Sequence, residues 1–261
     1  MIEPTMRLTD EQIEFYRENG FLCVPQPLTT ADELVTLRQA YDEIFSRRAG
    51  RETGDQFDLA GTDEEGKQAD LPQILSPGRY APVLREGLLF ANACALAHQL
   101  LGPGATFGGD HAIFKPASHG AATPWHQDEA YWDESLDYDS LSVWIPFQDA
   151  TVENGCMQFV PGSHRWEVQP HHSIGHDPRV HGLEIEYDVD PTTVVPCPIP
   201  AGAATFHHSR TLHYAGPNHT DQARRAYILG FSREAKKLET PRDFTWNKIK
   251  TTARSERANN A

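Results

Sequence analysis

The chain has 261 residues, of which 39% are hydrophobic and 23% charged, so it is long enough and apolar enough to bury one sizeable core. Its formal net charge of −14 argues against nucleic acid or an anionic membrane as the main partner, because both select basic surfaces. The opening residues are polar and no apolar run approaches the length of a membrane span, so we expect neither a signal peptide nor a transmembrane helix.

The N-terminal part, to about residue 103, is predicted to be mostly helical. Gly20 is expected to end the first helix, and a third apolar segment runs from about residue 83 to 101. The first two helices begin at capping-box patterns, Thr9 with Gln12 and Thr30 with Glu33. Residues 49–78 are rich in glycine and charge, and we expect them to form a long surface loop.

From about residue 104 to 233, short runs with alternating polarity are bounded by Gly, Pro, Asn and Asp. In one of them, alternate residues share a face: Leu141, Val143, Ile145 and Phe147 on one side, Ser142, Trp144 and Pro146 on the other. Such strands after a helical part predict an antiparallel sandwich or barrel with flanking helices. We expect a single domain, 1–261, that ends in a C-terminal extension (234–261) whose tail after about Thr251 is disordered.

Two clusters of polar residues suggest a metal centre. His126 and Asp128 are two positions apart, so on a strand they would point to the same side, although such a pair is weak on its own in a chain with thirteen histidines. Two histidines and one carboxylate form the facial triad of non-haem Fe(II) oxygenases, which leaves positions for a 2-oxo acid and dioxygen. Arg224 or Arg225 could bind a carboxylate through its two-pronged guanidinium. The later cluster offers several candidates for the third ligand: His207, His208, His213 and His219.

Four motifs in order resemble those of the phytanoyl-CoA dioxygenase family of Fe(II)/2-oxoglutarate-dependent oxygenases, and together they cover nearly the whole chain. They are LTDEQIEFYRENGFLCVPQPLT near the start, WHQDEAYW, WIPFQDATVENGCMQFVPGSH and LHYAGPNHTDQARRA. The resemblance implies a mainly β fold with flanking helices, a double-stranded β-helix (jelly roll, cupin-like). It also implies that Fe(II), 2-oxoglutarate and O2 are required, with ascorbate as an aid in vitro.

Carried onto this chain, the resemblance implies that His126 and Asp128 are the first two iron ligands. His213 is then the third, in place of His207 or His208, because the family's spacing from the distal histidine to its arginine fits His213 with Arg224. Arg224 would pair with the C5 carboxylate of 2-oxoglutarate, and Arg225 would face away. The resemblance further implies co-substrate contacts from Trp144, Lys115 and His111, and we expect a substrate wall from Trp132, Tyr131 and Phe206.

Two segments depart from the family pattern. Tyr214-Ala215 stands where the family often has Gly-Ser, so a hydroxyl that could bind the co-substrate is missing. The histidine-rich stretch from Arg165 to Asp190 matches no part of the pattern. It could hold a second metal ion, but its irregular spacing favours a loop that closes over the substrate.

The expected function is hydroxylation of a C–H bond in a small molecule, in secondary metabolism or catabolism. Desaturation, cyclisation or epimerisation at the same iron stays open, as does a non-catalytic jelly-roll binding protein. Asp128 argues against an iron halogenase, which lacks the carboxylate ligand, and a Zn- or Mn-dependent cupin enzyme gives Arg224 no role. Scattered cysteines without a C-x-x-C pair suggest free thiols in the cytoplasm. Substrate identity and oligomeric state are not predicted.

Overall fold

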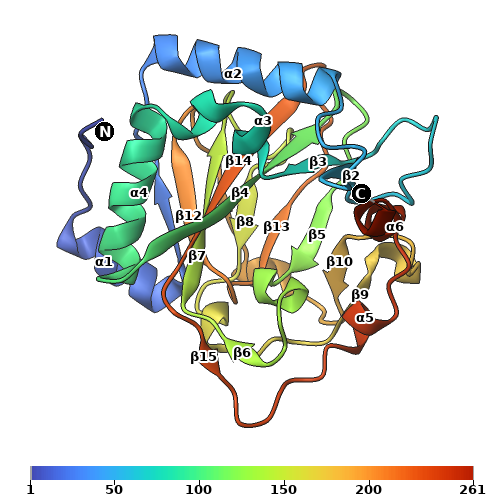
Figure 1. Cartoon of the computed structure of the whole chain (residues 1–261). Helices are drawn as coiled ribbons and strands as arrows, with labels where there is room; N and C mark the ends of the chain where they lie inside the picture. The colour runs from blue at the N-terminus through green and yellow to red at the C-terminus, as the bar shows by residue number, and fades with distance from the viewer. Residues whose placement is uncertain (1, 261) are drawn as a thin grey trace.

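The computed structural model describes residues 2–260, which form two facing antiparallel sheets with helices on one outer side (Figure 1). The seven-stranded sheet has the order β1 (Phe21–Val24), β12 (Ala204–His208), β7 (Ser140–Pro146), β14 (Arg224–Ser232), β4 (Thr106–Lys115), β3 (Pro72–Leu75) and β2 (Gln56–Asp58). The four-stranded sheet has the order β11 (Val195–Cys197), β8 (Met157–Phe159), β13 (His213–Ala215) and β5 (Thr123–His126). This confirms the predicted mainly β fold with flanking helices.

Two short two-stranded sheets and six α-helices, with several 3₁₀ turns, make up the rest of the regular structure in residues 2–260. The pairs are β9 (His171–Ser173) with β10 (Leu183–Ile185), and β6 (Leu136–Asp137) with β15 (Lys236–Lys237). The helices are α1 (Asp10–Asn19), α2 (Ala31–Ser46), α3 (Pro77–Tyr80), α4 (Leu88–Leu101), α5 (Thr245–Lys248) and α6 (Ala253–Asn260). Within residues 2–260, none of these helices is both long and apolar enough to cross a bilayer.

The period-two alternation of the strands separates two cores. Val143 of β7 and Leu229 of β14 pack with apolar residues of α2 and α4 on the outer face of the seven-stranded sheet. Their chain neighbours Trp144 and Ile228 face the four-stranded sheet and pack with Phe159. Neighbouring side chains on a strand point to opposite faces, so one face can bury the helices while the other lines the interior of the jelly roll.

The predicted starts of the N-terminal helices are largely confirmed. Thr9 and Gln12 form both hydrogen bonds of a capping box, and Gly20, with φ +78°, ends α1. At α2 the Thr30 hydroxyl accepts from the Glu33 amide. The Glu33 carboxylate accepts from the Thr29 hydroxyl and not from the Thr30 amide, so the capping box is only half formed. The third helix is shorter than expected, since residues 82–85 form a separate 3₁₀ turn before α4 begins at Leu88.

The prediction of a long surface loop over residues 49–78 is wrong. This segment contains β2 and β3, which extend the seven-stranded sheet beyond β4, and α3. Phe57 and Ile74 are fully buried. The strands are only three and four residues long and lie between glycine-rich, charged turns. β3 pairs with β4, which lies further along the chain, and β2 pairs with β3, so both strands depend on contacts that no local pattern records.

The expected disorder after Thr251 is also contradicted, because residues 253–260 form α6 beside β2 (Figure 1). The Arg254 guanidinium lies 5.2 Å from the Phe57 ring, and Arg257 pairs with Asp63. Gly54 allows this close approach, since a Cβ there would lie 2.6 Å from the Arg254 carbonyl oxygen. The helix has no buried residues of its own, so it is held mainly by these charged and stacking contacts.

Candidate metal centre and its cavities

The two histidines of the centre lie on paired strands. His126 is the last residue of β5 and His213 the first of β13, and the antiparallel register places them opposite one another. Their ring centroids are 4.1 Å apart. Asp128 follows two residues after His126, at the start of a 3₁₀ turn over Asp128–Tyr131, which directs its carboxylate back toward both rings.

The three side chains form a compact set of possible ligands. Oδ1 of Asp128 lies 3.6 Å from Nε2 of His126 and 3.5 Å from Nε2 of His213. All three ligand atoms lie within 4.8 Å of one another, which suits one metal ion bound between them. Among residues 2–260 this is the one group of three or more His, Cys, Asp or Glu side chains so arranged, so the histidine-rich segment forms no second such group there.

Hydrogen bonds orient both histidine rings for metal binding. Nδ1 of His126 lies 2.7 Å from the Pro124 carbonyl oxygen, and Nδ1 of His213 lies 2.8 Å from that of Thr211. A carbonyl only accepts, so each Nδ1 carries the proton and each Nε2 keeps its lone pair. This is the usual arrangement of metal-binding histidines, whose second nitrogen is fixed by a backbone or carboxylate oxygen.

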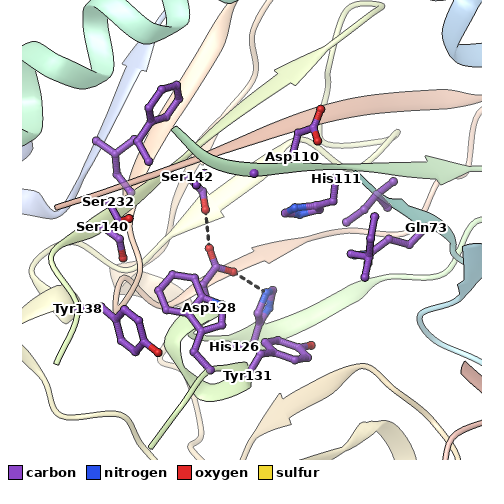
Figure 2. A pocket seen from close by; sticks show the side chains of 18 of the residues that line it. Gln73, Asp110, His111, His126, Asp128, Tyr131, Tyr138, Ser140, Ser142 and Ser232 are labelled. Carbon is purple, nitrogen blue, oxygen red and sulfur yellow. Dashed lines mark hydrogen bonds and ion pairs between the residues drawn. The ribbon is translucent and has the colours of Figure 1, made fainter. Parts of the chain in front are cut away.

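The Asp128 carboxylate is ionised and held by its neighbours. Burial alone would raise its pKa, but His213, together with His126 and His207, holds the pKa well below its usual value. Its second oxygen, Oδ2, accepts from the Ser142 hydroxyl at 2.7 Å. A dashed line marks this hydrogen bond in Figure 2. The site therefore offers a charged oxygen ligand in a fixed orientation.

A small cavity of about 50 Å³ connects this centre to Arg224. Arg224 is 1% exposed, and its Nε and Nη1 have no hydrogen-bond partner within the described part of the chain. Its guanidinium lies 5.4 Å from the Trp144 ring. Burial lowers the pKa of Arg224 to about 10, so the group is still positively charged at neutral pH. Buried cations are normally paired, and this one lacks an anion.

The neighbouring arginine lies on the opposite side of the sheet, as predicted. Arg225 binds Asp42 of α2 through Nε at 2.5 Å and Nη2 at 2.9 Å. Of the other expected co-substrate residues, Trp144 and His111 line the small cavity. Lys115 lies opposite Arg224 in the sheet but is not among the lining residues. Its amine donates to the carbonyls of Ala121 and Ala215, so its donors are used within the protein.

A larger cavity of about 460 Å³ opens on the other side of the metal centre. His111, His126 and Asp128 project into it, as Figure 2 shows. Tyr131 and Trp132 line it, as expected. The expectation for Phe206 is wrong: this residue is fully buried on the outer face of β12, in the core beneath the helices. Its parity on the strand directs it away from the cavity, and its neighbour His207 faces the metal centre instead.

Several residues of the larger cavity were not predicted from sequence. They include Leu59, Gln73, Tyr138, His181 and Phe231. His181 belongs to the histidine-rich segment, and its ring stacks on Tyr131 at 6.0 Å. In the same segment, Nε2 of His171 accepts from the backbone amide of Gln127, between two of the candidate ligands. The segment thus forms part of the cavity wall. That it closes over the substrate stays a prediction. No sequence signal distinguished His181 from the other histidines there.

A jelly roll that holds two histidines and an aspartate beside an unpaired buried arginine defines the class of non-haem iron, 2-oxo acid-dependent oxygenases. The model of the phytanoyl-CoA dioxygenase family matches residues 16–226. The chain belongs to this family, and it is a 2-oxoglutarate-dependent dioxygenase that uses Fe(II), 2-oxoglutarate and O2.

Individual relatives agree with this class. A probable alpha-ketoglutarate-dependent hypophosphite dioxygenase of Stutzerimonas stutzeri is 37% identical to this chain. The match covers 46% of this chain and 42% of the relative, so it spans less than half of the relative's length. L-proline trans-4-hydroxylase of Streptomyces griseoviridis is 31% identical over 87% of both chains. The crystal structure of EvdO2 from Micromonospora carbonacea var. aurantiaca covers 94% of this chain and 99% of its own, with 42% identity and a TM-score of 0.80. EvdO2 has also been crystallised with 2-oxoglutarate.

Proposed function

We propose that His126, Asp128 and His213 bind Fe(II), and that the enzyme hydroxylates a C–H bond of an uncharged small molecule. The observation that carries this proposal is the position of the three side chains between two cavities, one of which ends at the unpaired Arg224. The residues fit Fe(II), because both Nε2 atoms are free to coordinate and the carboxylate is ionised.

The small cavity fits 2-oxoglutarate. Arg224 would bind the carboxylate far from the metal, since its unpaired guanidinium needs an anion. Trp144 would fix the plane of that guanidinium, and His111, at the junction of the two cavities, would touch both the co-substrate and the substrate. For Lys115 we propose a supporting part, in which its hydrogen bonds to Ala121 and Ala215 hold the cavity wall beside Arg224.

The larger cavity fits an uncharged substrate. No Lys or Arg is among its described lining residues, so an anion such as a coenzyme A thioester would meet no positive charge there. The lining Asp110 is already saturated by Arg85, Tyr227 and the Gly78 amide. The remaining walls carry aromatic rings and hydroxyls, which favour a ring-bearing molecule with hydrogen-bonding groups: Tyr131, Trp132, Tyr138, Phe231, Ser140 and Ser232.

In this mechanism the protein supplies position and exclusion of water. When bound, Fe(II) with 2-oxoglutarate and O2 provides the oxidising chemistry, in which the 2-oxo acid is converted to succinate and carbon dioxide. Arg224 and Trp144 orient the co-substrate from one side. Tyr131 and Trp132 hold the substrate against the metal centre from the other, so that one C–H bond lies nearest the metal. We place this activity in the cytoplasm, where the four free cysteines would stay reduced.

The test is to incubate the purified protein with Fe(II), ascorbate and 2-oxoglutarate and a panel of uncharged, cationic and anionic small molecules. We expect succinate to form together with a product that is heavier by one oxygen atom, and we expect this from an uncharged compound. A product that has lost two hydrogens would indicate desaturation or cyclisation instead. Turnover of anionic compounds alone would contradict the proposed substrate class.

A further inference from the structure

We propose that His207 is a positioning residue which, together with Ser142, holds the Asp128 carboxylate so that a single oxygen faces the metal. The proposal rests on the proposed iron ligands. It adds a third histidine to the centre, one that would act on the metal through Asp128.

The two carboxylate oxygens of Asp128 have different surroundings. Oδ1 is the oxygen near the two proposed ligand histidines, at 3.6 Å from His126 and 3.5 Å from His213. Oδ2 points the other way: it lies 2.7 Å from the Ser142 hydroxyl and 3.3 Å from Nε2 of His207. Ser142 and His207 are directly opposite one another on β7 and β12, so the sheet register brings both donors to the same oxygen.

His207 has no other described role in the structure. It is 2% exposed and lines the small cavity, with its ring 4.3 Å from the ring of His213 and 5.5 Å from that of Phe159. Among residues 2–260, neither ring nitrogen has a partner that meets hydrogen-bond geometry, although Nε2 is already within reach of Oδ2. A buried imidazole nitrogen without a partner is unfavourable, so a small ring rotation that brings Nε2 into line with Oδ2 is favoured.

The surroundings of His207 differ from those of the two proposed ligands. Backbone carbonyls fix Nδ1 of His126 and of His213, which sets the tautomer that metal binding needs. Among residues 2–260, Nδ1 of His207 has no such acceptor, so no backbone carbonyl fixes its tautomer, and an N–H on Nε2 can donate a hydrogen bond to Oδ2 of Asp128. His207 also lies on the Oδ2 side of the carboxylate, away from the metal-facing oxygen.

This arrangement affects the number of open positions at the metal. A carboxylate whose Oδ2 is held by two donors binds through Oδ1 alone. With two histidines, it then leaves three positions of an octahedral ion for the 2-oxo acid and O2. Without His207, Oδ2 is held by one donor and can swing toward the metal, where it would compete with the co-substrate.

The experiment compares His207→Phe, which keeps a ring but has no donor, with His208→Phe as the matched control. His208 is the next residue, and its ring points away from the centre: Nδ1 accepts from the Arg210 amide, and the ring lies 5.9 Å from that of His164. Fe(II) affinity is measured without oxygen, and the charge-transfer absorption that develops on adding 2-oxoglutarate is recorded. The KM for 2-oxoglutarate and kcat are then determined separately.

We expect His207→Phe to weaken Fe(II) binding by about 10–100-fold, the usual effect of removing an outer hydrogen-bond partner of a metal ligand. We also expect a shifted charge-transfer band and a raised KM for 2-oxoglutarate. His207→Gln should partly restore the Fe(II) affinity, the position of the band and the KM, because the glutamine amide can donate to Oδ2. Ser142→Ala should change the same quantities in the same direction, which keeps the proposal testable if His207→Phe does not fold.

Two outcomes would overturn the inference. Wild-type iron affinity and an unshifted band in both His207→Phe and Ser142→Ala would show that Oδ2 needs neither donor. Complete loss of iron in His207→Gln, as expected for a ligand, would make His207 a ligand and not a positioning residue. Failure of the proposed function is distinguishable from both, because the unmodified protein would then bind no Fe(II) at all.

Discussion

His126 and His213 lie in register on adjacent antiparallel strands, with their ring centroids 4.1 Å apart. The pairing of β5 with β13 therefore brings together two of the three candidate ligands. Asp128 joins them from the turn that directly follows β5. Because both histidines are also oriented by backbone carbonyls, the site is organised by main-chain geometry.

The first prediction concerns iron content. His213→Ala removes one of three ligands, so the purified variant should lose most of its iron. His208→Ala should keep it, because that side chain points away from the centre. Metal analysis of both proteins after identical Fe(II) loading and desalting checks this. If His213→Ala retains its iron, another residue must be the third ligand.

The second prediction concerns the co-substrate. Arg224→Ala should weaken 2-oxoglutarate binding by about 2–5 kcal/mol, since it removes one partner of a buried charged pair. Arg225→Ala is the matched control and should leave 2-oxoglutarate binding unchanged, because Arg225 lies on the other side of the sheet in a partly exposed pair with Asp42. Calorimetric titration of 2-oxoglutarate into the Fe(II)-loaded proteins measures both. A larger effect from Arg225→Ala would reverse the assignment of the two arginines.

The third prediction concerns the substrate cavity. His181→Ala removes a ring that stacks on Tyr131, a contact worth about 0.5–1.5 kcal/mol, so KM for the substrate should rise by several-fold. KM for 2-oxoglutarate should stay unchanged, because His181 does not line the small cavity. His172→Ala, in the same hairpin and outside both cavities, should change neither value. Equal changes in the KM values of His181→Ala and His172→Ala would show that His181 is not part of the substrate site.

The fourth prediction tests the contact between α6 and the turn before β2. Gly54→Ala combines a positive φ of +75° with a Cβ that would lie 2.6 Å from the Arg254 carbonyl oxygen, so it should destabilise by about 1–3 kcal/mol. Gly66→Ala has a similar φ of +82° but no atom within 4 Å of its Cβ. Urea denaturation of the two variants separates backbone strain from displacement of α6. Equal losses would mean that α6 does not pack there.

The centre could be predicted from sequence because its residues occur in short, ordered motifs. His126 and Asp128 are two positions apart, and the distal motif places His213 and Arg224 at the family's spacing. Strand alternation put Trp144 on the face opposite to Val143, and the family resemblance implied that it lines the co-substrate. In β7 it faces the interior of the jelly roll. Local patterns of this kind survive folding because side-chain parity on a strand is fixed.

Other features depend on contacts that no local pattern records. β3 pairs with β4 and β2 pairs with β3, and this pairing brings Gln73 of β3 to the cavity. The sequence places Phe206 at the cavity, but its parity on β12 turns it outward, and the same parity brings His207 to Asp128. Two adjacent histidines look alike in a sequence, and only the register of β12 with β7 separates them.

The most direct test of the centre is an anaerobic titration of the Fe(II)-loaded protein with 2-oxoglutarate, followed by the charge-transfer absorption of the chelated ion. We predict that the unmodified protein binds one Fe(II) per chain and that the band saturates at one equivalent of 2-oxoglutarate. His213→Ala should give no band, and Arg224→Ala should reach it only at much higher 2-oxoglutarate concentration. A wild-type protein that holds iron but develops no band with 2-oxoglutarate would contradict the proposed site.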